Sequence, residues 1–303
     1  MKRVGIIGAS GYTGAELLRL SAQHPDLEVV YATGDSQAGT LASGLYPSLA
    51  ARYPDLVFEE FDAARAIGLD VVFLGLPHEA SMSLAPQLHG KVGCVVDLSA
   101  AFRLKEATMV ATPGCHVTAA TLALAPLVEA GVIEPTGVIV NSITGVSGAG
   151  RALKHTSMFC TVDEDVTAYG LLDHRHTPEI EQETGAQVLF TPHLAPLSRG
   201  LLATCYARPK GTVTTSSLLA TLAGRYSGEP FVVVRPASPS TKAAMGSNVA
   251  HITARFDERT NTVISICAID NLAKGASGGA VQAANVALGL SETAGLATVG
   301  LYP

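Results

Sequence analysis

A glycine-rich turn near the N-terminus constrains the fold of this chain more than any other feature. The sequence Gly8-Ala9-Ser10-Gly11-Tyr12-Thr13-Gly14 follows an apolar run at residues 4–7 and opens a helical pattern over residues 14–23. Glycine permits a tight turn and close backbone approach, and a helix N-terminus presents free N–H groups to a pyrophosphate. The spacing is GxxGxxG rather than GxGxxG. Its position between a strand and a helix nevertheless predicts a dinucleotide-binding turn rather than a plain surface turn.

Further apolar runs continue the strand–turn–helix pattern through the N-terminal part of the chain. Strands are predicted at residues 27–32, 71–75 and 92–98. Strands that alternate with helical segments are typical of a parallel sheet with right-handed crossovers. We therefore expect a doubly wound, Rossmann-type α/β domain over residues 1–114.

The pattern changes after about residue 117. A helix is predicted at residues 118–130 and another at 216–226, and several apolar runs between and after them alternate as strands do. These runs are residues 137–143, 188–191, 201–207, 231–234, 249–256 and 262–269. They predict an α+β domain with a mixed or antiparallel sheet over residues 115–274. A closing helix at residues 276–288 could return to the first domain, so residues 275–303 are expected to complete it.

Length, charge and cysteine usage exclude several classes of protein. A chain of 303 residues is long enough for two domains of roughly 150 residues. The 20 Lys and Arg residues against 26 Asp and Glu give a net charge of −6 without a basic run, so we expect no nucleic-acid partner. No apolar window is long enough for a membrane span or a signal peptide. Five cysteines without a CxxC motif indicate neither a zinc ribbon nor a disulfide framework, and they suit the cytoplasm.

Cys115 lies in a setting that the other cysteines lack. It follows Pro113-Gly114 and immediately precedes the predicted helix at 118–130, whose dipole would stabilise a thiolate. We therefore expect Cys115 to be a nucleophile. The role of its neighbour His116 stays open. The other four cysteines are predicted to pack or to lie outside the chemistry: Cys94, Cys160, Cys205 and Cys267.

The densest titratable cluster is Asp173-His174-Arg175-His176-Thr177-Pro178-Glu179. One helical turn could place the carboxylate of Glu179 against the imidazole of His176, which makes a base partner for the thiol. The same segment is also readable as a solvated helix start, with Thr177 as cap and Pro178 as the first residue. Two histidines one residue apart could chelate a metal, but no third ligand has suitable spacing, so we expect no metal.

The cofactor is not decided by the residues alone. After the second predicted strand, Asp35 could hold a ribose 2′-hydroxyl, whereas Thr33 and Ser36 could donate to a 2′-phosphate. An arginine that would favour NADP is missing here. Pro77 and His78 follow another predicted strand, at the sheet edge where open α/β sheets bind ligands.

Eight stretches of the chain resemble one family, the N-acetyl-γ-glutamyl-phosphate reductases, which are relatives of aspartate-semialdehyde dehydrogenase. They are GASGYTGAELLRL (8–20), LGLPHEAS (74–81), VVDLSAAFRL (95–104), TPGCHVTAATLAL (112–124), GVSGAGR (145–151), AYGLLDHRHTPEIEQ (168–182), FTPHLAPLSRGLLATCYA (190–207) and AIDNLAKGASGGAVQAANVALGL (268–290). They occur in the family's order and span nearly the whole chain.

The resemblance implies NADP(H) as cofactor, Cys115 as nucleophile and His176 as general acid and base. It implies a substrate site that includes Tyr169 and His174, and the spacing of Glu179 from His176 makes Glu179 a further candidate for that site. To these we add Arg151 and Arg199 as candidates for binding anionic oxygens, because arginine suits carboxylate and phosphate. The expected cofactor residues are Gly8, Ser10, Gly11, Tyr12, Thr13, Gly14, Thr33, Ser36, Pro77, His78, Ser147, Gly148 and Asn271.

The implied reaction is the NADPH-dependent reduction of N-acetyl-γ-glutamyl phosphate to N-acetylglutamate 5-semialdehyde through a Cys115 thioester, in arginine biosynthesis. The expected partners are this acyl phosphate, inorganic phosphate, and further copies of the chain in a homodimer or homotetramer. The chain departs from the family at Ala101, where DLSADFRL has an acid, at Thr112 in place of asparagine, and in a shortened segment at residues 105–111. Two alternatives therefore stay open: a different acyl phosphate, such as an aminoadipyl or secondary-metabolite analogue, or a catalytically silent NADP-binding regulatory protein.

Overall fold

The computed structural model describes residues 1–103 and 109–302. The chain forms two compact units, which we describe separately: residues 1–114 with 276–296, and residues 115–275 with 297–303. The prediction of a shortened segment at residues 105–111 falls largely outside the described residues. No helix in the described part of the chain combines the length and apolar character that a membrane span needs.

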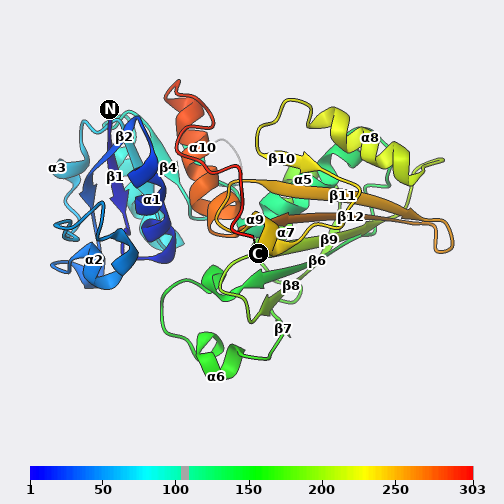
Figure 1. The fold of residues 1–303 in the computed structure, drawn as a ribbon, viewed down its shortest axis with the longest axis horizontal. Helices are drawn as coiled ribbons and strands as arrows, with labels where there is room; N and C mark the ends of the chain where they lie inside the picture. The colour runs from blue at the N-terminus through cyan, green and yellow to red at the C-terminus, as the bar shows by residue number, and fades with distance from the viewer. Residues whose placement is uncertain (104–108, 303) are drawn as a thin grey trace. The chain divides into compact units, whose positions relative to one another are not determined.

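The first unit is built on a five-stranded parallel sheet (Figure 1). Its strand order is β2-β1-β3-β4-β5, with β1 at Lys2–Ile7, β2 at Leu27–Ala32, β3 at Val71–Leu74, β4 at Val95–Asp97 and β5 at Val110–Ala111. The side chains of β3 are buried throughout, as expected for a strand covered on both faces. Burial of each large apolar side chain contributes roughly 1.5–3 kcal/mol. The predicted Rossmann-type α/β fold is confirmed.

The described residues of this unit form three helices of eight or more residues: α1 (Tyr12–Gln23), α4 (His78–Leu88) and α10 (Gly278–Ala287). Helix α10 contacts both α1 and β4, so the C-terminal segment returns to the N-terminal sheet. Shorter helical turns are η1 (Asp35–Gln37), α2 (Ala42–Leu45), η2 (Pro47–Leu49) and α3 (Ala63–Ala66). The imidazole of His24 is buried and lies 2.9 Å from Asn285 Oδ1 on α10.

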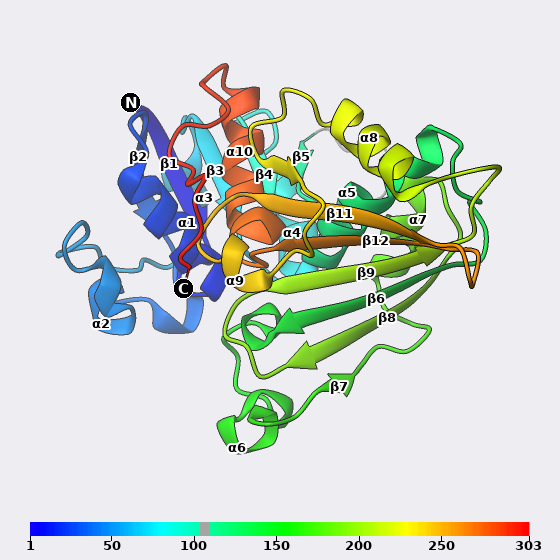
Figure 2. The same cartoon turned by 45° about the vertical axis from the view of Figure 1, so that its right-hand side comes forward.

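The second unit is built on a seven-stranded mixed sheet (Figures 1 and 2). Its order is β10-β11-β12-β9-β6-β8-β7, with β6 at Val138–Gly145, β7 at Thr167–Ala168, β8 at Val188–Ala195, β9 at Leu201–Ala207, β10 at Val232–Val234, β11 at Ala250–Asp257 and β12 at Thr262–Ile269. Strand β6 pairs in parallel with β8 and antiparallel with β9. The mixed-sheet prediction is therefore confirmed.

Helices cover one face of this sheet. Helix α5 (Cys115–Glu129) packs on β9 and β12 and contacts α7 (His176–Thr184) and α8 (Thr215–Arg225). On β9, alternate residues point inward and are buried, whereas those between them are partly exposed. The smaller elements are η3 (Val146–Ala149), η4 (His155–Ser157), α6 (Phe159–Val162), α9 (Thr241–Ala244) and η5, a π-helical turn (Ala273–Ser277).

Several predicted boundaries are wrong for a physical reason. Helix α5 begins at Cys115, one turn before the expected start at 118, because His116 and Val117 are buried and extend the packed face of the helix. Strand β4 is limited to Val95–Asp97 rather than residues 92–98. Pro77 and His78, expected to follow a strand, are the N-cap and first residue of α4, a helix that the sequence pattern did not predict.

Candidate active site

Cys115 is the first residue of α5, a helix of 15 residues, and it is half-buried. The N–H groups in the first turn of a helix have no intrahelical acceptor, and the helix dipole favours negative charge at this end. A thiolate that forms at Cys115 is therefore stabilised by the helix. Because the helix starts at the cysteine itself, the thiol lies closer to the dipole than the sequence predicted.

The other cysteines lack this setting. Cys205 and Cys267 are fully buried, and burial raises the pKa of the Cys205 thiol to about 12 and that of Cys267 still further above its usual range. Burial also raises the pKa of the Cys94 thiol. Cys160 is exposed on the short helix α6. A thiol held in its protonated form by burial is a poor nucleophile.

Four aromatic and imidazole rings gather around His116, the residue that follows the cysteine. The ring centroids of His174 and His176 are 4.7 Å apart, and those of Tyr169 and His174 are 5.5 Å apart. His116 lies 5.7 Å from His176 and 5.4 Å from Phe190. The structure thus brings Tyr169, His174 and His176, predicted from a segment more than fifty residues away, to the neighbour of Cys115. Phe190 has no signal in the sequence beyond its apolar strand.

The two histidines next to His176 are held neutral. The backbone N–H of His176 donates to Nδ1 of His174 over 3.1 Å, so the proton of the His174 ring lies on Nε2. Burial lowers the pKa of His174, with the positive charge of Arg175 adding to the effect. Burial also lowers the pKa of His116, to about 3. Both rings therefore act as hydrogen-bonding groups rather than cations at neutral pH.

Tyr169 joins the ring cluster to the thiol. Its Oη lies 3.0 Å from Nε2 of His116. Burial raises the pKa of the Tyr169 phenol well above its usual range, and the negative charge of Cys115 raises it further. The phenol therefore keeps its proton and lies within electrostatic reach of the Cys115 sulfur.

Helix α7 places His176 and Glu179 one turn apart. The helix begins at His176 with Arg175 as its N-cap, so the alternative start, with Thr177 as cap and Pro178 as first residue, is wrong. Both His176 and Glu179 are buried, which excludes a solvated helix start. Among residues 1–103 and 109–302, no group of three His, Cys, Asp or Glu side chains is placed to hold a metal ion.

A glycine that no sequence pattern singles out lies against the nucleophile. Gly275 is in the π turn η5, where its N–H donates to the carbonyl of Asp270 over 3.0 Å. A Cβ atom built at residue 275 would lie 2.7 Å from Cβ of Cys115 and 3.2 Å from its Cα. Only glycine leaves room for Cys115 at this contact. π turns are common at functional sites, but the sequence does not reveal where one forms.

Three of the proposed site residues, Ser147, Arg199 and Asn271, belong to a hydrogen-bonded network at the end of β12. Asn271 Oδ1 accepts from the N–H of Gly200 over 2.8 Å, and Asn271 Nδ2 donates to Oγ of Ser147 over 2.9 Å. Arg199 pairs with the fully buried carboxylate of Asp270 at 3.1 Å. Asn271 and Arg199 therefore hold the ends of β6 and β12 in place, besides any contact with a ligand.

The turn after β6 carries the remaining predicted residues of this unit. A Cβ atom at Gly148 would lie 3.5 Å from Oγ1 of Thr144. That hydroxyl is buried and has no hydrogen-bond partner within the described residues, which indicates that a ligand or water satisfies it. Arg151 follows Gly150, a glycine with φ of +81°. No ion pair of Arg151 is recorded in the part of the chain that the structure describes, so its guanidinium can pair with an anion.

The glycine-rich turn of the first unit has the shape that a pyrophosphate needs. Gly8 has φ of +84°, and a Cβ atom there would lie 2.5 Å from the carbonyl oxygen of Gly75. A Cβ atom at Gly14 would lie 2.4 Å from the carbonyl oxygen of Gly8. Gly11, the N-cap of α1, has no side chain to occupy the helix N-terminus. The free N–H groups of the first turn, which includes Tyr12 and Thr13, therefore fit a phosphate group.

Neighbouring side chains hold this turn. The hydroxyl of Ser10 donates to the carbonyl of Gly34 over 2.9 Å, and the phenol of Tyr46 donates to the carbonyl of Ser10 over 2.7 Å. Thr33 is buried, and its Oγ1 accepts from the N–H of Gly8 over 3.1 Å. Of the hydroxyls proposed for a 2′-phosphate, Ser36 is the exposed one.

The turn after β4 is held by a second set of contacts. The carboxylate of Asp97 is fully buried and accepts from the hydroxyls of Ser81 and Ser99 over 2.8 and 2.7 Å. Nδ1 of His78 accepts from the N–H of Ala100 over 2.9 Å. His78 therefore fixes the loop that follows the strand.

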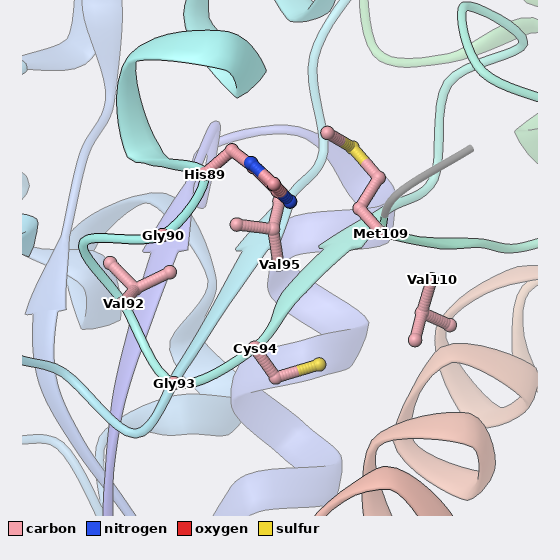
Figure 3. A pocket seen from close by; sticks show the side chains of 8 residues that line it. All are labelled: His89, Gly90, Val92, Gly93, Cys94, Val95, Met109 and Val110. Carbon is pink, nitrogen blue, oxygen red and sulfur yellow. The ribbon is translucent and has the colours of Figure 1, made fainter.

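A cavity of about 460 Å³ lies elsewhere in the first unit (Figure 3). Its lining includes His89, Cys94, Val95 and Val110, which precede or begin β4 and β5. Open parallel sheets bind ligands beyond the carboxyl ends of their strands, so this cavity is at the opposite edge from the glycine-rich turn.

Two family models match the chain with its two units in this order. Residues 3–132 match the NAD binding domain of semialdehyde dehydrogenases, and residues 115–271 match the semialdehyde dehydrogenase dimerisation domain. The fold and the site therefore define a semialdehyde dehydrogenase.

Curated relatives narrow this class. The N-acetyl-gamma-glutamyl-phosphate reductases of Symbiobacterium thermophilum and Acidothermus cellulolyticus are each 43% identical to this chain over 99% of both lengths. The chain belongs to the family of N-acetyl-gamma-glutamyl-phosphate reductases. The first alignment spans 346 positions against 303 residues here, so this chain is shorter than that relative.

Solved structures support the fold. Aspartate semialdehyde dehydrogenase II from Vibrio cholerae, complexed with ASA, superposes with a TM-score of 0.74 at 16% identity over 94% of this chain and 98% of that one. The aspartate semialdehyde dehydrogenase from Candida albicans, solved with NADP, has a TM-score of 0.71 at 14% identity over 95% and 98%.

Proposed function

We propose that this protein reduces N-acetyl-γ-glutamyl phosphate to N-acetylglutamate 5-semialdehyde with NADPH, a step of arginine biosynthesis. The observation that carries this proposal is the position of Cys115: a thiol at a helix N-terminus, within electrostatic reach of Tyr169, whose neighbour His116 lies against the imidazoles of His174 and His176. The names of the full-length relatives agree with it. In this proposal, residues 1–114 with 275–303 bind NADP, and residues 115–274 carry catalysis and association.

The Cys115 thiolate would attack the carbonyl carbon of the acyl phosphate. A C–S bond forms and the bond between the acyl carbon and the bridging phosphate oxygen breaks. Phosphate leaves with the electron pair of that bond and takes up a proton from solvent. The product of this step is a thioester on Cys115. The first-turn N–H groups of α5 are suited to the developing negative charge.

NADPH, when bound, supplies a hydride to the thioester carbon. His176 then donates a proton to the resulting alkoxide, which gives a thiohemiacetal. In the collapse that follows, His176 takes that proton back, the C–S bond breaks and the aldehyde leaves as the thiolate reforms. His174, neutral with its proton on Nε2, would donate a hydrogen bond to the substrate.

Anionic groups of the substrate need a cation. Arg151 is partly exposed and is our candidate, because arginine binds carboxylate and phosphate in a bidentate manner. Arg199 is already paired with Asp270, so we expect it to contribute less than Arg151 to binding the anionic groups of the substrate. Glu179, buried one turn after His176, would orient that imidazole as well as line the substrate site.

The cofactor site of this proposal is the glycine-rich turn. Gly8, Gly11 and Gly14 leave the space, and the first turn of α1 supplies the N–H donors. Ser36 on the exposed turn η1 is our choice for the 2′-phosphate of NADP. Pro77 and His78 at the start of α4, and Ser147, Gly148 and Asn271 in the second unit, complete the proposed set.

The chain would work as a homodimer or homotetramer in the cytoplasm. Residues 115–271 match a dimerisation domain, and the face of the seven-stranded sheet opposite α5 exposes apolar side chains, among them Ile139, Ile143 and Leu189. The five cysteines are free thiols, as suits a reducing compartment.

The test is a coupled assay in the oxidative direction. N-acetylglutamate 5-semialdehyde, NADP and phosphate should give NADPH, and Cys115→Ser should reduce turnover by at least about 10³-fold while cofactor binding is kept. If only another aldehyde turns over, the chemistry stands and the substrate is a different acyl phosphate, an alternative that Ala101 and the shorter chain keep in view. Cofactor binding without turnover of any aldehyde would indicate a silent regulatory protein.

A further inference from the structure

His116 is the second residue of α5 and is buried, with only 2% of its surface exposed. Its Nδ1 lies 2.7 Å from Oγ of Ser142 on β6, and its Nε2 lies 3.0 Å from Oη of Tyr169. These contacts form one chain, Ser142–His116–Tyr169, that runs from the core of the sheet to the phenol beside Cys115. None of the roles assigned above uses Ser142 or His116.

The direction of the hydrogen bonds follows from the inventory of donors. Ser142 is fully buried, and its hydroxyl has one hydrogen-bond partner in the described part of the chain, Nδ1 of His116. If Nδ1 carried the proton and donated to Ser142, the serine's own hydrogen would be buried without an acceptor, which is costly. The arrangement that satisfies every buried donor has Ser142 donating to Nδ1, and it leaves the imidazole proton on Nε2.

The same proton count fixes Tyr169. Nε2–H of His116 donates to the phenol oxygen over 3.0 Å, so the phenol does not donate its own hydrogen to His116. That hydrogen has no other acceptor recorded within residues 1–103 and 109–302. It can therefore be donated to a group that binds beside Cys115.

We propose that Ser142 and His116 are positioning residues that hold Tyr169 as a hydrogen-bond donor toward the substrate carbonyl oxygen at Cys115. This inference rests on the proposed function for the identity of that oxygen, but the direction of the hydrogen-bond chain does not depend on it. With the opposite tautomer, Tyr169 would donate to His116 and would offer only lone pairs to the oxyanion.

The surroundings keep the imidazole in this state. Burial favours a neutral ring with one protonated nitrogen, and edge contacts from Phe190 and His174, at centroid distances of 5.4 and 5.8 Å, restrict its rotation. The backbone of Tyr169 is tied to β8, because its N–H donates to the carbonyl of Pro192 over 3.0 Å. A donor fixed before the reaction costs little reorganisation when negative charge develops.

The first test reads the tautomer without any substrate. In the full chain labelled with ¹⁵N-histidine, the His116 resonances are assigned by their loss in His116→Phe. We expect a protonated Nε2 and an unprotonated Nδ1 at neutral pH, and Ser142→Ala should abolish this preference. A protonated Nδ1 in the wild-type protein would overturn the proposal.

The second test is kinetic. Tyr169→Phe should lower kcat about 10- to 100-fold with KM changed less than about 3-fold, as for loss of an oxyanion donor. His116→Phe should lower kcat about 10-fold, and the double variant should be no worse than Tyr169→Phe, because both remove one interaction. His116→Gln keeps an N–H donor and should retain more activity than His116→Phe, so a folding defect of the latter does not decide the outcome.

Ser265→Ala is the matched control for Ser142→Ala. Ser265 is equally buried in the same sheet, and its hydroxyl donates to the carbonyl of Ala123 on α5. We expect kcat to fall several-fold in Ser142→Ala and to stay unchanged in Ser265→Ala. Multiplicative losses in the His116→Phe/Tyr169→Phe pair would overturn the proposal. Absence of turnover in the wild-type protein would refute the proposed function, while the tautomer measurement would still decide the hydrogen-bond chain.

Discussion

At the scale of single residues, burial decides which titratable groups remain neutral around Cys115. Desolvation lowers the pKa of His116 and raises the pKa of Tyr169, so it disfavours the charged form of each group. The same effect raises the pKa of the Cys205 and Cys267 thiols and keeps them protonated. Cys115 differs from them by position alone, at a helix N-terminus and with partial access to solvent. Its sequence context, Pro-Gly before a predicted helix, was sufficient to predict that Cys115 differs from the other cysteines.

Burial of the His116 ring predicts a specific pH dependence of stability. Its pKa falls from 6.5 to about 3 on folding, so below about pH 6.5 the unfolded chain binds a proton that the folded chain does not. Stability from this group is therefore complete above about pH 6.5 and is lost as pH falls, by up to about 1.4 kcal/mol per pH unit. Denaturant unfolding between about pH 5 and pH 7 should show a shallower slope in His116→Phe than in the wild-type protein. Parallel curves for the two proteins would contradict the prediction.

At the scale of elements, the strand–turn–helix pattern was sufficient to predict the parallel sheet, and alternation was sufficient for the mixed one. Contacts distant in sequence were not predictable. Ser142 meets His116 only because β6 lies beside β9, the strand on which α5 packs, and the inward face of a strand depends on its register. Gly275 meets Cys115 only because a π turn follows β12. The sequence indicated the chemistry of the site but not the residues that position it.

The π turn η5 leads to a prediction for Gly275. A methyl group there would lie 2.7 Å from Cβ of Cys115, an atom fixed by the first turn of α5, so the clash must displace the nucleophile or the turn. We expect Gly275→Ala to lower the free energy of unfolding by about 1–3 kcal/mol and to slow alkylation of Cys115, measured by mass spectrometry of the peptide that contains it.

Gly224→Ala is the control for this substitution. Gly224 lies in helix α8 with open space around its Cα, so alanine should be tolerated there and should stabilise the helix by up to about 1 kcal/mol. An alkylation rate in Gly275→Ala equal to that of the wild-type protein would show that the contact with Cys115 is not restrictive.

At the scale of the whole molecule, the two units differ in how far they bury the faces of their sheets. The first unit covers its sheet with helices from both ends of the chain. The second places α5, α7 and α8 on one face, while the other face presents Ile139, paired in register with Leu189 and Tyr206. Leu189 is 50% exposed. Exposed apolar side chains on a sheet face are typical of an interface between subunits.

If the subunits associate through the exposed face of the seven-stranded sheet, a charged substitution on that face should dissociate the oligomer. A charged ammonium at the centre of an interface that buries on the order of 1,200–2,000 Å² has no partner there and costs several kcal/mol. We therefore expect Leu189→Lys to dissociate the oligomer into monomers in sedimentation velocity. Leu153→Lys should not, because Leu153 is 99% exposed outside the sheet. A wild-type protein that sediments as a monomer would contradict the proposed association, and an intact Leu189→Lys oligomer would move the interface to another surface. Because the substitution lies on the exposed face of β8, the fold of the monomer should survive it, so loss of assembly and loss of folding can be separated by circular dichroism of the same sample.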